Sequence, residues 1–166
     1  MFEQRPERQF LALLDEHGPS ILALLRRLCR NADDAEDAFQ ETAVRVWRSL
    51  DSRPRLRNPR GWLLTIAYRT FLDLAKRRRV PVGGEDPAEL PDRNLLPPEA
   101  AVERQEETEQ VRGAVAALPE ALREVVFLHY TGRLSLHETA EAMGLSVGTV
   151  KSRLNAALGK LRGFLE

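Results

Sequence analysis

Residues 136–155 read LHETAEAMGLSVGTVKSRLN, the most informative stretch of the chain. Ala140 is small enough to let two helices approach closely. Gly144, four residues later, suits a turn that needs a positive φ. Val150 follows where a second helix would pack back on the first. A small residue, a turn glycine and an aliphatic residue at these spacings are typical of a helix-turn-helix.

The second helix of this motif would present hydrogen-bond donors that suit the base edges and phosphates of DNA. Ser135 and Ser146 are placed to cap the two helices, and Glu138 completes a capping box with Ser135. A helical hairpin without DNA is the alternative, and the density of donors argues against it. We predict that six residues of the second helix and its cap read DNA: Ser146, Thr149, Lys151, Ser152, Arg153 and Asn155.

Charge is separated along the chain, although 25 basic and 25 acidic residues give a net charge of zero. Residues 53–79 contain nine basic residues and one acidic residue, a net charge of +8. Residues 80–110 carry −7 and residues 31–51 carry −4. Solvated helix faces would explain any one of these blocks. The pattern as a whole indicates separate partners for separate surfaces.

Two helical blocks flank a segment of different composition. Residues 80–98 contain five prolines and the pair Gly83-Gly84, with neither a helical nor a strand period. We expect an extended, mobile, acidic tether there. No segment shows the alternation of apolar and polar residues that is typical of a β-strand. We therefore predict an all-α protein of two small helical domains, with boundaries at residues 1–79, 80–98 (the flexible linker) and 99–166.

The first block shows several helix boundaries. A short helix should stop near Gly18, and Pro19 can open the next one. Asp33 with Glu36 three residues on has the pattern of a capping box for a third helix. Asn58, followed by a proline, should cap a fourth helix that runs to a cluster of three arginines.

The fourth helix carries a mixed stripe of aromatic, polar and basic residues. An exposed Trp62 among cations could stack on an unpaired base while the cations hold phosphates. A half-buried core tryptophan and a solvated basic helix end are the alternatives. The residues expected to contact DNA in this block are Arg60, Trp62, Thr65, Arg69, Asp73, Lys76 and Arg77.

The order of these motifs resembles that of bacterial extracytoplasmic-function sigma factors over nearly the whole chain. Residues 34–42 (DAEDAFQET) and 46–48 (VWR) resemble region 2.2, which docks on the β′ clamp helices of RNA polymerase. Residues 58–67 (NPRGWLLTIA) resemble regions 2.3 and 2.4, which open and read the −10 element. Residues 118–125 (LPEALREV) and 148–154 (GTVKSRL) resemble region 4, which reads the −35 element.

The resemblance implies core RNA polymerase, bound at its β′ clamp, and promoter DNA as partners, with an anti-sigma factor as a further candidate. This chain departs from the family at Arg69, where an asparagine is usual, and at Thr139, where an isoleucine is usual. We expect Asp37 and Glu41 to lack an intrachain cation at ideal spacing. The residues that the resemblance assigns to polymerase are Asp34, Asp37, Gln40 and Glu41.

Several classes of function are excluded at this stage. A single cysteine and three histidines without ligand spacing argue against a disulfide framework or a metal site. No nucleophile with a base and no phosphate loop is present, so we expect neither an enzyme nor a cofactor. No apolar run or signal core appears, so we expect a cytoplasmic protein without membrane insertion. Two alternatives stay open: a stand-alone helix-turn-helix regulator, and a sigma-like protein that sequesters an anti-sigma factor.

Overall fold

The computed structural model describes residues 4–50, 56–79 and 102–165. These residues form helices, and no strand occurs among them, which confirms the all-α prediction. The chain divides into two compact units, residues 1–91 and 92–166. The predicted linker, residues 80–98, lies outside the described residues, so the predicted domain boundaries stay predictions.

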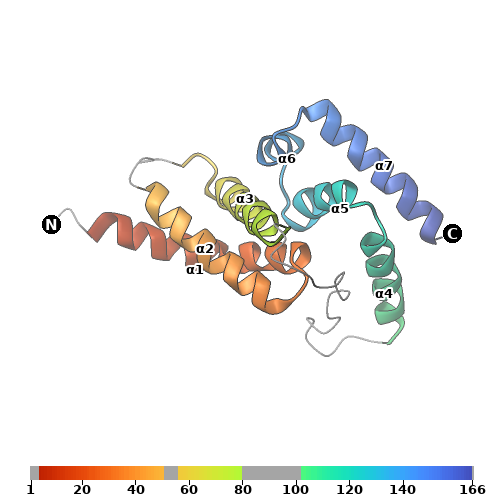
Figure 1. The fold of residues 1–166 in the computed structure, drawn as a ribbon, viewed down its shortest axis with the longest axis horizontal. Coiled ribbons are helices and arrows are strands. Elements are labelled where there is room, and N and C mark those ends of the chain that lie inside the picture. Colours follow the sequence, from red (N-terminus) through yellow and green to blue (C-terminus); the bar gives the residue numbers. More distant parts are fainter. Residues whose placement is uncertain (1–3, 51–55, 80–101, 166) are drawn as a thin grey trace. The chain divides into compact units, whose positions relative to one another are not determined.

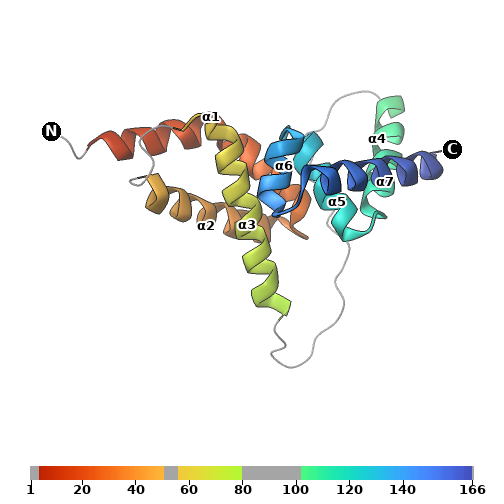
Figure 2. The ribbon, with the colours of Figure 1, turned by 90° about the horizontal axis from the view of Figure 1, so that it is seen from above.

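The first unit is a bundle of three helices, each in contact with the other two (Figure 1). They are α1 (Gln4–Leu28), α2 (Ala32–Leu50) and α3 (Pro59–Arg79). Figure 2 shows α3 running across α1 and α2. The core is built from fully buried aliphatic side chains of all three helices, among them Ile21, Leu24, Leu25, Val46, Leu63 and Leu64.

Helix α1 continues through Pro19, so the expected break near Gly18 is wrong. A proline inside a helix removes one hydrogen bond and costs about 3 kcal/mol. Ile21, Leu24 and Leu25 follow the proline and are fully buried. Gly18 is itself buried, and a Cβ there would lie 3.7 Å from the ring of Phe39. Burial of this continuous apolar face offsets the cost of the proline.

The caps of α2 and α3 are both asparagines. Asn31 accepts a hydrogen bond from the backbone N–H of Asp34 at 2.8 Å, so the expected cap at Asp33 is wrong by two residues. Asn58 accepts one from the N–H of Gly61 at 3.0 Å, which confirms the predicted start of α3. Asn31 acts as the N-cap because its short amide side chain reaches the first free N–H groups of the helix.

The second unit contains α4 (Val102–Ala116), α5 (Glu120–Val126), α6 (Leu136–Met143) and α7 (Val147–Leu165). A single π-helical turn, Phe127–Thr131, extends α5. Helices α4, α5 and α6 all pack on α7 (Figure 1). Their shared core consists of Leu118, Val125, Val126, Ala140, Val150, Leu154 and Ala157.

The helix-turn-helix has the predicted local chemistry. The Ser135 hydroxyl accepts from the N–H of Glu138, whose carboxylate accepts from the Ser135 N–H, which completes the capping box. Gly144 ends α6 with φ +66°. Thr139, the departure from the usual isoleucine, is fully buried, and its hydroxyl donates to the Ser135 carbonyl at 2.8 Å. The threonine is therefore accommodated by a local hydrogen bond.

Two glycines of the second unit should respond oppositely to alanine. We expect Gly144→Ala to lower the free energy of unfolding by about 1–2 kcal/mol, because an L side chain is strained at this positive φ. We expect Gly159→Ala to raise it by roughly 0.5–1 kcal/mol, because Gly159 lies inside α7 and a Cβ there meets nothing within 4 Å. Urea denaturation followed by circular dichroism measures both.

The two tryptophans, Trp47 and Trp62, lie in the first unit, so tryptophan fluorescence provides an internal control. Its transition should not move in either glycine variant. Equal effects of the two substitutions would contradict the assignment of Gly144 to a turn that needs glycine.

Candidate functional site

The outer face of α2 carries the four residues expected to contact polymerase. Asp37 and Gln40 are exposed, and neither has an ion-pair partner among the described residues. Asp34 and Glu41 are different, because each pairs with an arginine of this unit. The four residues therefore share one helix face, but only two of them are unengaged.

Glu41 pairs with Arg45, one helical turn further along α2. Arg45 Nε donates to Glu41 Oε1 at 3.0 Å. The expectation that Glu41 has no intrachain cation at ideal spacing is wrong, because residues four apart lie on the same helix face.

Two ion pairs connect α2 to α3. Arg45 Nη1 donates to Asp73 Oδ2 at 2.7 Å, and Arg78 pairs with Asp34. The hydrogen bond to Asp73 is the main reason that the pKa of Arg45 is raised above its ordinary value. Arg45 thus joins a residue assigned to polymerase, Glu41, to one assigned to DNA, Asp73.

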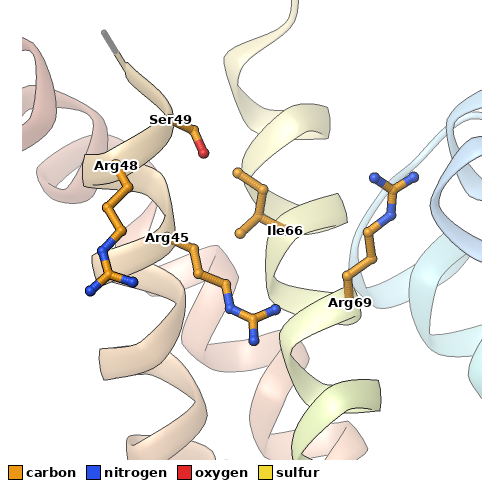
Figure 3. Close-up of a pocket in the computed structure, with 5 residues that line it drawn as sticks. All are labelled: Arg45, Arg48, Ser49, Ile66 and Arg69. Carbon is orange, nitrogen blue, oxygen red and sulfur yellow. The ribbon is translucent and has the colours of Figure 1, made fainter. Parts of the chain in front are cut away.

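A pocket of about 320 Å³ opens between α2 and α3, lined by Arg45, Arg48, Ser49, Ile66 and Arg69. In Figure 3, Ile66 points from α3 toward α2, and the Arg45 side chain reaches from α2 toward α3. The Arg48 and Arg69 side chains extend away from the space between the two helices, so their guanidinium groups do not converge there.

Sequence reasoning found only Arg69 of these five residues. The missed signal was the helical spacing of Arg45, Arg48 and Ser49, which places them on neighbouring turns of α2. Ile66 and Arg69 repeat the same spacing on α3. A helical period locates such stripes on each helix but does not show that two stripes face each other.

The α3 residues predicted to contact DNA differ in how exposed their side chains are. Arg69, Lys76 and Arg77 are exposed, whereas Arg60, Trp62, Thr65 and Asp73 are half-buried. The Thr65 hydroxyl donates to the carbonyl of Gly61 at 2.8 Å, and Asp73 is engaged by Arg45. Part of the Trp62 surface stays accessible, as stacking on a base requires.

In the second unit, the predicted DNA-reading residues lie at the start of α7. The Ser146 hydroxyl accepts from the Thr149 N–H at 3.1 Å, so Ser146 caps α7 as predicted. Ser146 Oγ also lies 2.9 Å from Thr149 Oγ1. Lys151, Ser152 and Asn155 are exposed and Arg153 is half-buried. Val150, Leu154 and Ala157 hold the opposite face of α7 in the core.

Cys29, the single cysteine, lies close to the pair of Asp34 and Arg78. Burial is the main cause that raises the pKa of its thiol, the Asp34 carboxylate adds to the rise and Arg78 opposes it, and the result is a pKa of about 11. We expect iodoacetamide to alkylate Cys29 at pH 8 at least about tenfold more slowly than a free thiol, because the thiolate reacts. The rate should keep rising with pH toward the pKa.

The Asp34→Asn variant provides the matched comparison. It removes a charge that disfavours the thiolate, so the pKa of Cys29 should fall and alkylation should accelerate. Arg78→Gln should slow alkylation for the opposite reason. Identical rates in all three proteins would contradict the proximity of this ion pair to Cys29.

No group of side chains suited to hold a metal ion occurs among the described residues. None of the helices described here is long and apolar enough to cross a membrane.

Comparison with known proteins identifies both units. Residues 13–80 match the Sigma-70 region 2 family and residues 108–161 match the Sigma-70, region 4 family. The chain is 34% identical over 147 residues to the ECF RNA polymerase sigma factor EcfG of Rhodopseudomonas palustris, covering 89% of this chain and 80% of that protein. It is 32% identical over 165 residues to the sigma factor RpoE of Cereibacter sphaeroides, covering 96% and 88%.

Solved structures of sigma factors also resemble this chain. The sigma factor RpoE of Bartonella quintana, in complex with the anti-sigma factor NepR, matches with a TM-score of 0.68 and 25% identity, covering 98% of this chain and 97% of that one. CnrH in complex with the cytosolic domain of CnrY matches with a TM-score of 0.66 and 27% identity, covering 96% and 88%.

Proposed function

Because this chain belongs to the extracytoplasmic-function RNA polymerase sigma factors, which direct core polymerase to promoters, we propose how its two units divide that work. The first unit docks on polymerase and captures the −10 element, and the second unit reads the −35 element. Residues 1–79 and 99–166 make up these two parts, and residues 80–98 link them. The pocket between α2 and α3, together with the helix-turn-helix, carries this proposal.

Docking uses the acidic face of α2. Asp34, Asp37, Gln40 and Glu41 present carboxylates and an amide on one helix face, which favours a basic partner surface on the β′ clamp. Asp37 and Gln40 make the first contacts, because they have no partner within the described residues. Asp34 and Glu41 must exchange or share Arg78 and Arg45 when polymerase docks.

The −10 element is captured at the pocket of α2 and α3. This open pocket of about 320 Å³ leaves room for an unpaired base to lie against the two helices. Ile66 offers an apolar contact for the face of that base. Trp62 stacks on a neighbouring base, and Lys76 and Arg77 hold phosphates. Unstacking costs a few kcal/mol per base, which stacking and phosphate contacts offset.

The −35 element is read by the first turns of α7 in the major groove. Thr149, Lys151, Ser152, Arg153 and Asn155 supply polar groups, and Ser146 orients the start of the helix. Residues two apart on a helix differ by about 200°, so Lys151 and Arg153 cannot both contact the same base edge. We assign Arg153 to base reading, because its fork can bind guanine in a bidentate manner, and Lys151 to phosphate.

We expect Arg153→Ala to relax the preference at one −35 position, at a cost of about 1–3 kcal/mol for the preferred base. Lys151→Ala should weaken binding to all −35 sequences alike, and that binding should depend less steeply on salt concentration. Transcription by the holoenzyme from templates randomised at the −35 element measures both. If Lys151→Ala changed the preferred −35 bases and Arg153→Ala lowered transcription equally from all templates, the roles of the two residues would be reversed.

The chain acts by binding, without a catalytic step of its own, since polymerase supplies the chemistry. It works in the cytoplasm, where core polymerase and promoter DNA are found. The anti-sigma factor NepR binds one of the structural neighbours described above, so an anti-sigma factor is also a candidate partner here. A stand-alone regulator would need no polymerase-docking face, and a mere decoy for an anti-sigma factor would need no donors on α7.

A further inference from the structure

We infer that Arg133, in the turn before α6, binds a phosphate of the DNA backbone that borders the −35 major groove. The inference rests on the proposed function, because it assumes that the start of α7 enters that groove. It adds a DNA contact from outside the recognition helix, at a residue that is not among those predicted to contact DNA.

Arg133 has an unusual backbone conformation. Its φ is +52°, and within the described part of the chain it is the one residue other than glycine with a positive φ. An L side chain is strained in this left-handed region, whereas glycine adopts it readily. The fold alone would therefore favour glycine at position 133. An arginine held there indicates a role for its side chain outside the fold.

Contacts on both sides of Arg133 impose this conformation. The Gly132 N–H donates to the Phe127 carbonyl at 2.8 Å and closes the π-helical turn. A Cβ at Gly132 would lie 2.5 Å from the Leu128 carbonyl oxygen, so this position requires glycine. The Leu134 N–H donates to the same Leu128 carbonyl at 3.2 Å, and Leu134 is buried. Arg133 thus lies on a turn that is fixed by the residues before and after it.

The guanidinium group of Arg133 is available to a partner. The residue is exposed, and its side chain has no ion pair or hydrogen bond with the described residues. Residues 125–137 contain no acidic residue, and the next one, Glu138, accepts the Ser135 N–H at 2.7 Å in the capping box. A guanidinium only donates hydrogen bonds and keeps its charge, so its partner should be an anion. Its planar fork matches the oxygens of a phosphate.

The geometry of the helix-turn-helix brings Arg133 to the DNA backbone. Helix α6 packs on α7, and residues 144–146 join the end of α6 to the start of α7 (Figure 1). Arg133 lies at the other end of α6. The eight residues of α6 span about 12 Å, which is about the width of the major groove. With the start of α7 in the groove, the first helix crosses the backbone, so the far end of α6 meets the phosphates beside the groove.

The test is the affinity of preassembled holoenzyme for promoter DNA, measured by fluorescence anisotropy at salt concentrations from about 50 to 200 mM. We expect Arg133→Gly to lower the affinity about fivefold for all −35 sequences alike. Loss of one phosphate contact should also reduce the slope of log K against log salt by about 0.9. Arg133→Lys keeps the charge and should keep most of the wild-type slope.

Stability separates a DNA contact from a structural role. Glycine adopts a positive φ without strain, so Arg133→Gly should unfold at the same urea concentration as the wild type or at a higher one. A clear fall in stability together with weaker binding would show that Arg133 supports the fold, which would overturn the inference.

Arg162→Gln is the matched control. Arg162 is exposed in the last turn of α7, about 22 Å along the helix from Val147. The substitution removes the same charge from the same unit, away from the groove. The affinity and the salt slope should both stay at their wild-type values. Equal losses in Arg162→Gln and Arg133→Gly would show a general charge effect and would contradict a specific contact.

Methylphosphonate substitution identifies the phosphate that Arg133 contacts. A methylphosphonate is neutral, so at the contacted position it should weaken wild-type binding but cause no further loss in Arg133→Gly. That position should border the major groove that α7 reads. If each methylphosphonate along the −35 element affected the two proteins equally, Arg133 would contact no phosphate and the inference would be wrong.

The remaining outcomes separate the inference from the function on which it rests. Equal DNA affinity of wild type and Arg133→Gly, with the −35 preference intact, would overturn the phosphate contact alone. A loss of affinity for core polymerase rather than for DNA would assign Arg133 to a protein partner and would also overturn it. Holoenzyme that ignores the −35 sequence would overturn the proposed function of the second unit.

Discussion

Replacement of both Asp37 and Gln40 by arginine is expected to lower the affinity for core polymerase by about 100-fold or more. The two side chains are exposed on the acidic face of α2, where the partner surface should be basic. Like charges placed opposite each other cost several kcal/mol. Neither side chain is part of an ion pair within the described residues, so the three-helix bundle should stay folded. A pull-down titration with core polymerase measures the change.

The control for this variant is Asp15→Arg with Ala23→Arg on α1. Both positions are exposed, and the pair adds the same charge as the α2 variant. Polymerase affinity should stay within about twofold of wild type, because rim and remote charges contribute little. Equal losses in the two double variants would show a general charge effect and would count against α2 as the docking helix.

Charge reversal at the pocket should abolish promoter opening while leaving the holoenzyme assembled. Arg48→Glu with Arg69→Glu replaces two guanidinium groups at the pocket by carboxylates, which repel the unpaired strand. We expect open complexes, measured by permanganate reactivity of unpaired thymines, to fall by about 100-fold. Binding to core polymerase should change little.

Arg26→Glu with Arg30→Glu gives a control of equal charge change. Both arginines are exposed near the end of α1 and are not part of the pocket. Open complexes should form at nearly the wild-type level. If this control lost opening as completely as the pocket variant, net charge rather than the pocket would control the step.

Local chemistry made the helix-turn-helix predictable from sequence. Ser135 with Glu138 and Gly144 each have one low-energy role, as a cap and as a left-handed turn. Their effects extend over only three or four residues, so no tertiary information was needed. The polar face of α7 followed from the position of Val150, which packs the second helix back on the first.

Tertiary contacts explain what sequence reasoning missed. Pro19 has a strong local preference to begin a helix, but burial of Ile21 and Leu24 against the rest of the bundle overrides it. The link between Arg45 and Asp73 spans 28 residues and exists only because α3 lies beside α2. The pocket also depends on tertiary packing, because its lining comes from two helices whose relative rotation is set by the core.

The most direct test of the account is run-off transcription by core polymerase with and without this chain. The template is linear DNA randomised at the −35 and −10 positions with a fixed spacing. We predict transcripts of one defined length only when the chain is present, from templates enriched in a two-part motif. The Asp37→Arg, Gln40→Arg variant should give none. The same transcripts from core polymerase alone, or transcripts without an enriched motif, would contradict the account.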